Sequence, residues 1–173
     1  MKIFYVHHAL RDKGNPPSQD DGILPLGEED AFITAQIFEK SKEFLNIKAI
    51  YTSPYFRCKK TAEIINEKLN VPVVFEPRFN EFVGVFSLVK GEKEVVQVET
   101  WEDCQKRIQK AIKEIVNKHE ENKNDAVICV TSGVNITGFI NLAYGLNASN
   151  DKPFPMVSSC SPIGFEITKE MCK

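Results

Sequence analysis

Two kinds of segment alternate along the chain when its hydrophobic and polar positions are compared. Short apolar runs, rich in β-branched residues, predict strands at residues 2–6, 48–52, 72–75, 126–130 and 164–168. Longer stretches, in which apolar residues recur every three or four positions, predict helices at residues 27–45, 54–70, 100–122 and 133–145. Strands that alternate with helices favour an α/β fold, with a mainly parallel sheet covered by helices on both faces.

The predicted helices carry local signals at their starts and along their apolar faces. Ser53 and Pro54 form a common helix start, with Ser53 as the N-cap and Pro54 at the first helical position. The apolar face of the first helix is expected to comprise Ala31, Thr34, Ile37, Phe38, Ser41, Phe44 and Leu45. That of the long helix is expected to comprise Trp101, Cys104, Ile108, Ala111, Ile112 and Ile115. Residues 77–98 have a mixed pattern that fits a partly buried loop or short strands.

Composition narrows the class of protein further. The 173 residues, 42% of them hydrophobic, are enough for one domain with its own core. A net charge of -2 and a pI of about 6.0 do not indicate binding to nucleic acid or to an anionic membrane. The apolar runs are too short to span a bilayer and the first residues lack the pattern of a signal peptide, so we expect a cytoplasmic protein.

The five cysteines point to packing rather than to metal or disulfide chemistry. Cys129 lies in an apolar run and Cys104 on an apolar helix face, which is typical of small core residues in a reducing compartment. Their spacing contains no Cys-x-x-Cys pair and no Cys followed six residues later by Arg, the phosphate loop of cysteine phosphatases. A glycine-rich nucleotide fingerprint is also missing, so we expect neither a metal nor a cofactor.

Chemically versatile side chains follow three of the predicted strands. The first strand ends in His7-His8, the second in Thr52-Ser53 with Arg57 soon after, and the fourth in Thr131-Ser132. These groups are expected to converge, because the carboxyl ends of parallel strands lie along one edge of a sheet. Imidazole can act as a nucleophile near neutral pH, guanidinium matches phosphate in shape, and helix starts near 54 and 133 would favour an anion. Together with Glu81, they predict a phosphate-handling site.

The order of these motifs resembles the histidine phosphatase superfamily, which has the phosphoglycerate mutase-like fold. Residues 53–62 match the family's Ser-Pro-x-x-Arg-x-x-x-Thr-Ala block at every fixed position. Weaker blocks follow in the family's order: His7-His8-Ala9 for Arg-His-Gly, Ile23 to Ala31 for a helix start, Phe79-Asn80-Glu81 for the acidic block, Glu99-Thr100 with Arg107, and Val130 to Gly133 for Val-Ser-His-Gly. The resemblance spans nearly the whole chain and implies a three-layer αβα sandwich formed by one domain, residues 1–173.

The resemblance also implies roles for individual residues. In the family, the first-motif histidine attacks phosphorus and becomes phosphohistidine, arginines and a second histidine bind the phosphoryl oxygens, and an acid protonates the leaving group. By position, His8 is the nucleophile, Arg57 a phosphate ligand and Glu81 the acid. Two departures weaken the site, since His7 replaces the first arginine and Ser132 the second histidine. Both remain candidate phosphate ligands, although His7 is mostly neutral at pH 7 and Ser132 carries no charge.

Alternatives remain for several of these residues. Arg11, or Lys13 in the same loop, is a candidate replacement cation, although a solvated loop charge is the commoner role for such a residue. Arg57 taken alone fits a surface helix charge, and Glu81 fits a loop carboxylate equally well. His119, among polar residues at a helix end, is not expected to replace the missing histidine. Ser132 is not expected to be a hydrolase nucleophile, because it lacks the Gly-x-Ser-x-Gly context and no histidine follows it.

Two functions from different classes fit these features. One is a slow or specialised phosphomonoesterase that works through phosphohistidine on His8 and takes a phosphorylated small molecule or phosphoprotein. The other is a pseudophosphatase that binds a phosphate group or a protein partner without turnover. The short segment between Glu81 and Ser132 leaves little room for a large lid, so mutase activity is not expected. The oligomeric state stays open.

Overall fold

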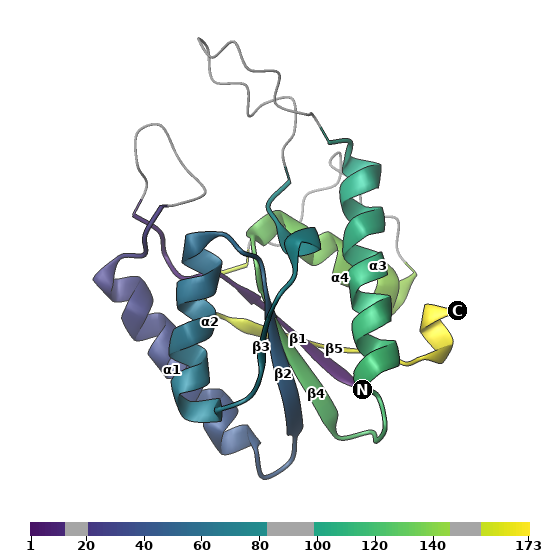
Figure 1. Cartoon of the computed structure of the whole chain (residues 1–173), viewed down its shortest axis with the longest axis horizontal. Helices are drawn as coiled ribbons and strands as arrows, with labels where there is room; N and C mark the ends of the chain where they lie inside the picture. Colours follow the sequence, from purple (N-terminus) through teal and green to yellow (C-terminus); the bar gives the residue numbers. More distant parts are fainter. Residues whose placement is uncertain (13–20, 83–98, 146–156) are drawn as a thin grey trace.

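A five-stranded sheet with the order β3-β2-β4-β1-β5 forms the centre of the protein (Figure 1). The structure is a computed structural model that describes residues 1–12, 21–82, 99–145 and 157–173. Its strands are β1 (Lys2–His7), β2 (Asn46–Thr52), β3 (Val73–Phe75), β4 (Asp125–Thr131) and β5 (Pro162–Glu166). All neighbouring pairs are parallel except β1 and β5, so β5 is an antiparallel edge strand.

Burial explains the position of the strands in the sheet. Every residue of β4 is buried, as expected for a central strand between two parallel neighbours. β4 pairs with β1 in a register that places His7 beside Thr131, and with β2 in a register that places Thr52 beside Val130. The carboxyl ends of the three strands that carry the candidate chemistry therefore lie side by side.

Helices cover both faces of the sheet and complete the three layers (Figure 1). Helices α1 (Pro25–Ser41) and α2 (Phe56–Leu69) bury Phe38, Cys58 and Ile65 against one face. Helices α3 (Trp101–His119) and α4 (Ile136–Tyr144) cover the other face, where Ile108, Phe139 and other side chains share a core cluster with alternate sheet residues. The α/β sandwich expected from the pattern is confirmed.

The expected apolar face of the first helix is partly wrong. Ala31, Thr34 and Phe38 are buried as expected, but Ile37 is 46% exposed and Phe44, in the turn after α1, is 71% exposed. The helix carries two apolar stripes, and only one of them faces the sheet. The expected apolar stripe of α3 is confirmed. Its first member, Trp101, is half-buried, and the others are buried: Cys104, Ile108, Ala111, Ile112 and Ile115.

The expected start of the second helix is also wrong. Helix α2 begins at Phe56, and its N-cap residue Tyr55 makes no side-chain capping bond. Ser53 is not the N-cap, because the helix begins three residues after it. Its hydroxyl donates a hydrogen bond of 2.8 Å to the Asn80 side-chain oxygen and accepts one of 3.3 Å from the Tyr55 N–H. The Ser-Pro pair thus belongs to the loop between β2 and α2, where it positions side chains rather than starting the helix.

The C-terminal half differs only in detail from the expectation. The segment expected as one short helix is a 3-10 turn, Gly133–Asn135, followed by α4, so no regular helix begins at 133. The last strand begins two residues earlier than expected. Of the segment 77–98, a 3-10 turn at Pro77–Phe79 is described, and the part from 83 to 98 lies outside the described residues. Within the described ranges, the helices are too short or too polar to cross a membrane.

Candidate active site

His7 and His8 lie at the carboxyl end of β1, with their rings edge to face and their centroids 4.5 Å apart. The backbone N–H of His8 donates to the Thr131 carbonyl at 2.9 Å, which extends the β1–β4 pairing by one residue. Nδ1 of His8 lies 2.8 Å from the carbonyl oxygen of Ala9. Because a carbonyl only accepts, Nδ1 carries the proton and Nε2 carries the lone pair.

Arg57 joins His8 to Glu81. Its Nε donates to Nε2 of His8 at 3.1 Å, and one of its terminal nitrogens donates to the Glu81 carboxylate. The Arg57 side chain is 1% exposed, whereas that of Glu81 is half-buried. The guanidinium also lies 5.0 Å from the ring centroid of Tyr55, which covers it. Three sequence-predicted residues are thus in direct contact.

Thr61 connects the histidine loop to helix α2. Its hydroxyl donates to the Arg57 carbonyl at 2.7 Å and accepts from the Ala9 N–H at 2.9 Å. The residue occupies the fixed Thr of the ten-residue block, four positions after Arg57, so the block supplies both the cation and the bond that holds the loop beside it. No role for Thr61 was predicted, although its place in the block was the available signal.

Burial sets the charge state of both histidines. It is the main reason why the pKa of His8 falls to about 3, and repulsion from His7 and from the guanidinium of Arg57 adds to the shift. The pKa of His7 is also lowered, mainly by burial, although the Val157 carbonyl and Glu81 oppose the shift. Both rings are therefore neutral near pH 7.

His7 and Ser132 occupy the places where the family pattern has cationic side chains. Nδ1 of His7 lies 3.1 Å from the Val157 carbonyl, and its ring packs against Gly133, where an added Cβ would come within 3.4 Å of the ring. Ser132 is 2% exposed, and its hydroxyl makes no hydrogen bond within the described part of the chain. The Ser132 carbonyl accepts from the Tyr5 hydroxyl at 2.9 Å, which fixes the backbone.

A buried amide holds the segment that carries Glu81. The side-chain nitrogen of Asn135 donates to the carbonyls of Phe79 and Asn80 at 2.9 and 3.0 Å and lies 2.7 Å from the Thr131 hydroxyl. That hydroxyl itself donates to the Phe79 carbonyl at 2.6 Å. The end of β4 is thereby tied to the acidic segment. Asn135 was not predicted, and nothing in its local sequence distinguishes it from an ordinary polar residue.

The remaining candidate cations lie at different distances from this centre. Arg11 is ion-paired with Asp21 at 3.7 Å, yet its charge helps to lower the pKa of both His7 and His8, so it is close enough to act on them electrostatically. Lys13 lies outside the described residues. His119 bonds to the Tyr51 hydroxyl at 2.7 Å, away from the two histidines. Among the residues that the structure describes, no cluster of three or more His, Cys, Asp or Glu side chains could hold a metal ion.

Comparison with solved structures confirms the fold. The chain is similar to YhfR of Bacillus stearothermophilus, with a TM-score of 0.75, 20% identity and coverage of 95% of this chain and 90% of the other. It is also similar to the protein histidine phosphatase SixA complexed with tungstate, with a TM-score of 0.71, 13% identity and coverage of 99% of this chain and 91% of the other. A mycobacterial glucosyl-3-phosphoglycerate phosphatase matches with a TM-score of 0.72, 17% identity and coverage of 94% of this chain and 88% of the other. These likenesses establish the phosphoglycerate mutase-like fold.

Sequence comparison identifies the family. A Hydrogenobacter thermophilus protein provisionally named phosphoserine phosphatase 2 is 24% identical over 173 aligned positions, which cover 82% of this chain and 83% of that protein. The family profile of the histidine phosphatase superfamily (branch 1) matches residues 19–87 and 84–173. That match covers most of the chain, and it includes the Arg57 and Ser132 blocks. The chain is a member of the histidine phosphatase superfamily.

Proposed function

We propose that the protein is a phosphomonoesterase that acts through a phosphohistidine intermediate on His8. The observation that carries the proposal is the orientation of this ring. Its Nδ1 proton is held by the Ala9 carbonyl, its Nε2 lone pair points at Arg57, and burial keeps the ring unprotonated. A neutral, fixed imidazole is what a nucleophile at phosphorus requires.

The proposed reaction has two steps that use the same groups. The His8 Nε2 lone pair attacks phosphorus while the bond between phosphorus and the ester oxygen breaks, and Glu81 in its acid form gives a proton to the departing oxygen. The Glu81 carboxylate then takes a proton from water, whose oxygen attacks phosphorus as the bond to His8 breaks. Arg57, which contacts both residues, would bind the phosphoryl oxygens and neutralise their negative charge.

We expect the rate to be low. Phosphoryl transfer depends almost entirely on positioning and on neutralising charge. Here the family's first arginine is a histidine of lowered pKa, and its second histidine is a serine. Losing one hydrogen-bond donor to the transition state typically costs about 100- to 1,000-fold in rate. When residues act together, the losses from removing each of them are seldom additive. Arg11 is the candidate partial replacement, since its charge already reaches His8.

A second candidate function is phosphate binding without turnover. The Ser132 hydroxyl, which makes no hydrogen bond to the residues that the structure describes, favours it, because this buried group can donate to a phosphoryl oxygen while adding no charge for catalysis. In either case the proposed ligand is a phosphorylated small molecule or phosphoprotein. The name of the Hydrogenobacter thermophilus relative makes phosphoserine the first natural ester to assay.

The deciding experiment compares hydrolysis of an aryl phosphate by the native protein, by His8→Ala and by the matched control His119→Ala, at pH 5 to 8. We expect activity in the native protein and the control and none in His8→Ala. Mass spectrometry after an alkaline quench should find one added phosphoryl group on His8. Equal background rates in all three proteins would contradict the proposed phosphatase activity. Phosphate binding under those conditions would favour a pseudophosphatase that binds phosphate without turnover.

A further inference from the structure

Helix α1 presents an apolar ridge to solvent on the side away from its buried face. The ridge consists of Leu26, Ile33 and Ile37, which are 58, 53 and 46% exposed. At 3.6 residues per turn these positions lie within about 40° of one another, and they are well separated from the buried stripe of Ala31, Ala35 and Phe38. Phe44, in the turn after the helix, is exposed at the same spacing.

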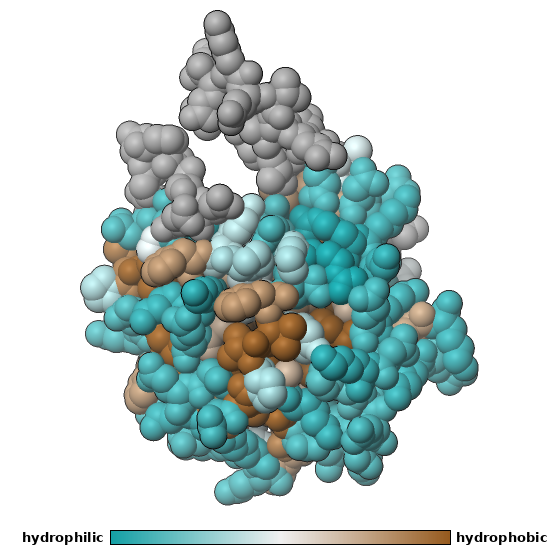
Figure 2. All heavy atoms as spheres, viewed as in Figure 1, coloured by the Kyte–Doolittle hydropathy of each residue, from teal (hydrophilic) through white to brown (hydrophobic). Residues whose placement is uncertain are grey.

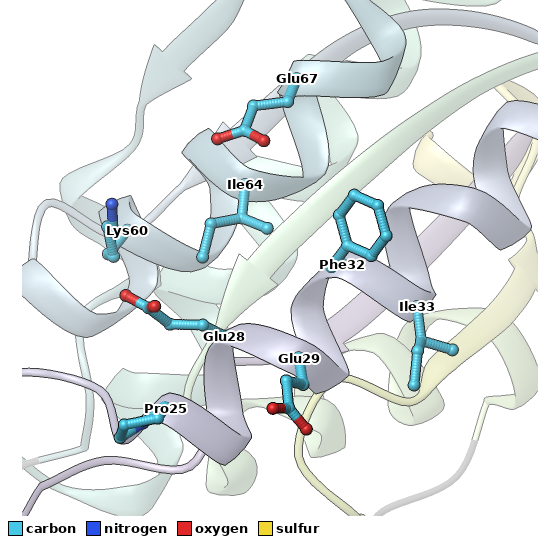
Figure 3. A pocket seen from close by; sticks show the side chains of 8 residues that line it. All are labelled: Pro25, Glu28, Glu29, Phe32, Ile33, Lys60, Ile64 and Glu67. Carbon is cyan, nitrogen blue, oxygen red and sulfur yellow. The ribbon is translucent and has the colours of Figure 1, made fainter.

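Ile33 separates two hollows, one on each flank of the ridge. The first, of about 480 Å³, lies between α1 and α2, and Figure 3 shows Phe32, Ile33 and Ile64 lining it. The second, of about 300 Å³, lies between α1 and the segment from Ser158 to Pro162. A ridge between two grooves is the surface that a helix offers for packing against another helix.

The apolar residues of the ridge have nearly the same spacing when α1 is read in either direction. Ile33 and Ile37 are equidistant from Ala35, and so are Leu26 and Phe44. A two-fold axis level with Ala35 would therefore bring Ile33 beside Ile37 of a second copy. Such an isologous contact is the commonest form of soluble homo-oligomer.

The charges beside the ridge obey the same symmetry. Glu29 and Lys40 are exposed, stand six and five positions from Ala35, and lie on the same flank of the ridge, about 60° and 40° from Leu26. In an antiparallel pair of α1 helices, Glu29 of each copy would face Lys40 of the other. The seam would thus have an apolar centre with two complementary ion pairs.

We propose that α1 forms a two-fold, antiparallel interface with α1 of a second copy of this chain. The helix has 17 residues and is about 25 Å long, so the seam falls at the small end of specific interfaces and a micromolar dimer is expected. Neither the ridge nor its flanking charges include His8, Arg57 or Glu81, so the dimer leaves the catalytic groups unchanged.

Sedimentation equilibrium from about 1 to 300 μM, a range that suits a small interface, tests the proposal. The native protein should dimerise, and Ile33→Asp should be monomeric. Met171→Asp, which alters an exposed apolar residue elsewhere, should dimerise like the native protein. A native protein that stays monomeric over the whole range would overturn the proposal, as would a dimer that Ile33→Asp leaves intact.

Charge reversal identifies the face. Glu29→Lys and Lys40→Glu should each weaken the homodimer roughly tenfold, because each replaces two attractive contacts with repulsive ones. An equimolar mixture of the two variants should associate about as well as the native protein, since both contacts are then complementary again. Failure of the mixture to recover would overturn the antiparallel register. Aryl phosphate hydrolysis by each variant should equal that of the native protein.

Discussion

The Nε–H of Arg57 donates to Nε2 of His8 across 3.1 Å, so the arginine binds the same lone pair that would attack phosphorus. Attack requires this hydrogen bond to break. In the proposed mechanism, the released N–H would then donate to a phosphoryl oxygen, and the guanidinium would change its partner without leaving the site. Glu81 accepts from a terminal nitrogen of the same guanidinium, so Arg57 links the two proposed catalytic groups.

Replacing Arg57 with Lys should lower kcat/KM for an aryl phosphate by about 100-fold or more. A lysine ammonium cannot contact His8 and Glu81 together in the planar geometry of the guanidinium. Arg78→Lys is the matched control, since Arg78 pairs with Glu76 and Glu114 away from the histidines. Steady-state kinetics on both variants decide the matter, and similar losses in the two would show that Arg57 has no special role.

Activity should rise as the pH falls from 7 to 5, by up to about tenfold per unit. The pKa of His7 is lowered, so its cationic form is scarce at pH 7 and becomes commoner as the pH approaches that pKa from above. The pKa of His8 is about 3, so the nucleophile stays unprotonated throughout this range. His7→Gln should flatten the pH profile of kcat/KM, and a native profile that is already flat would show that protonated His7 is not needed.

Introducing the family's second histidine, Ser132→His, should raise kcat/KM about tenfold or more, because it returns a hydrogen-bond donor that can carry charge. Ser132→Ala is the control, since it removes a hydroxyl that has no partner among the described residues. We expect it to leave the free energy of unfolding nearly unchanged and to lower kcat/KM, because it also removes a candidate donor to the phosphoryl group. Circular dichroism should establish that the larger ring is accommodated, and a folded Ser132→His with no gain would contradict the assignment.

Asn135→Ala should lower the free energy of unfolding by about 1 to 3 kcal/mol, because the Asn80 carbonyl loses its bond to this amide and the Phe79 carbonyl keeps only the Thr131 hydroxyl as a side-chain donor. Urea denaturation measures this loss. Thr131→Val removes the other side-chain donor to the Phe79 carbonyl, so the double variant, which removes both donors, should cost more than the two single losses together. Strict additivity of the two losses would indicate that the residues act separately.

The fold was predictable because its signals are local and redundant. Each long helix and strand repeats its apolar pattern over several residues, and the ten-residue block from Ser53 identified the family from one continuous segment. The orientation of α1 was not predictable, since Ile37 and Phe44 have the same hydrophobicity as Phe38 and only packing against the sheet decides which stripe is buried.

The contacts of Arg57 with His8 and Glu81 were predictable, but the hydrogen bonds that hold the surrounding segments were not. Strand ends in a parallel sheet predicted that His8, Arg57 and Ser132 would lie near one another. The bond from Ser53 to Asn80 was not predictable, because it joins residues far apart in the sequence and no local pattern encodes such a pair. The network around Asn135 was missed for the same reason.

The reactivity of the five free thiols can be used to follow opening of the core. Cys58, Cys104, Cys129 and Cys160 are buried, and burial raises the pKa of each thiol, whereas Cys172 is only half-buried. A thiol reagent needs the thiolate and access to it, so alkylation should begin at Cys172 and reach the other four only when the core opens. Because Cys58 lies on the α2 side of the sheet and Cys104 on the α3 side, the order in which they react would reveal which layer separates first.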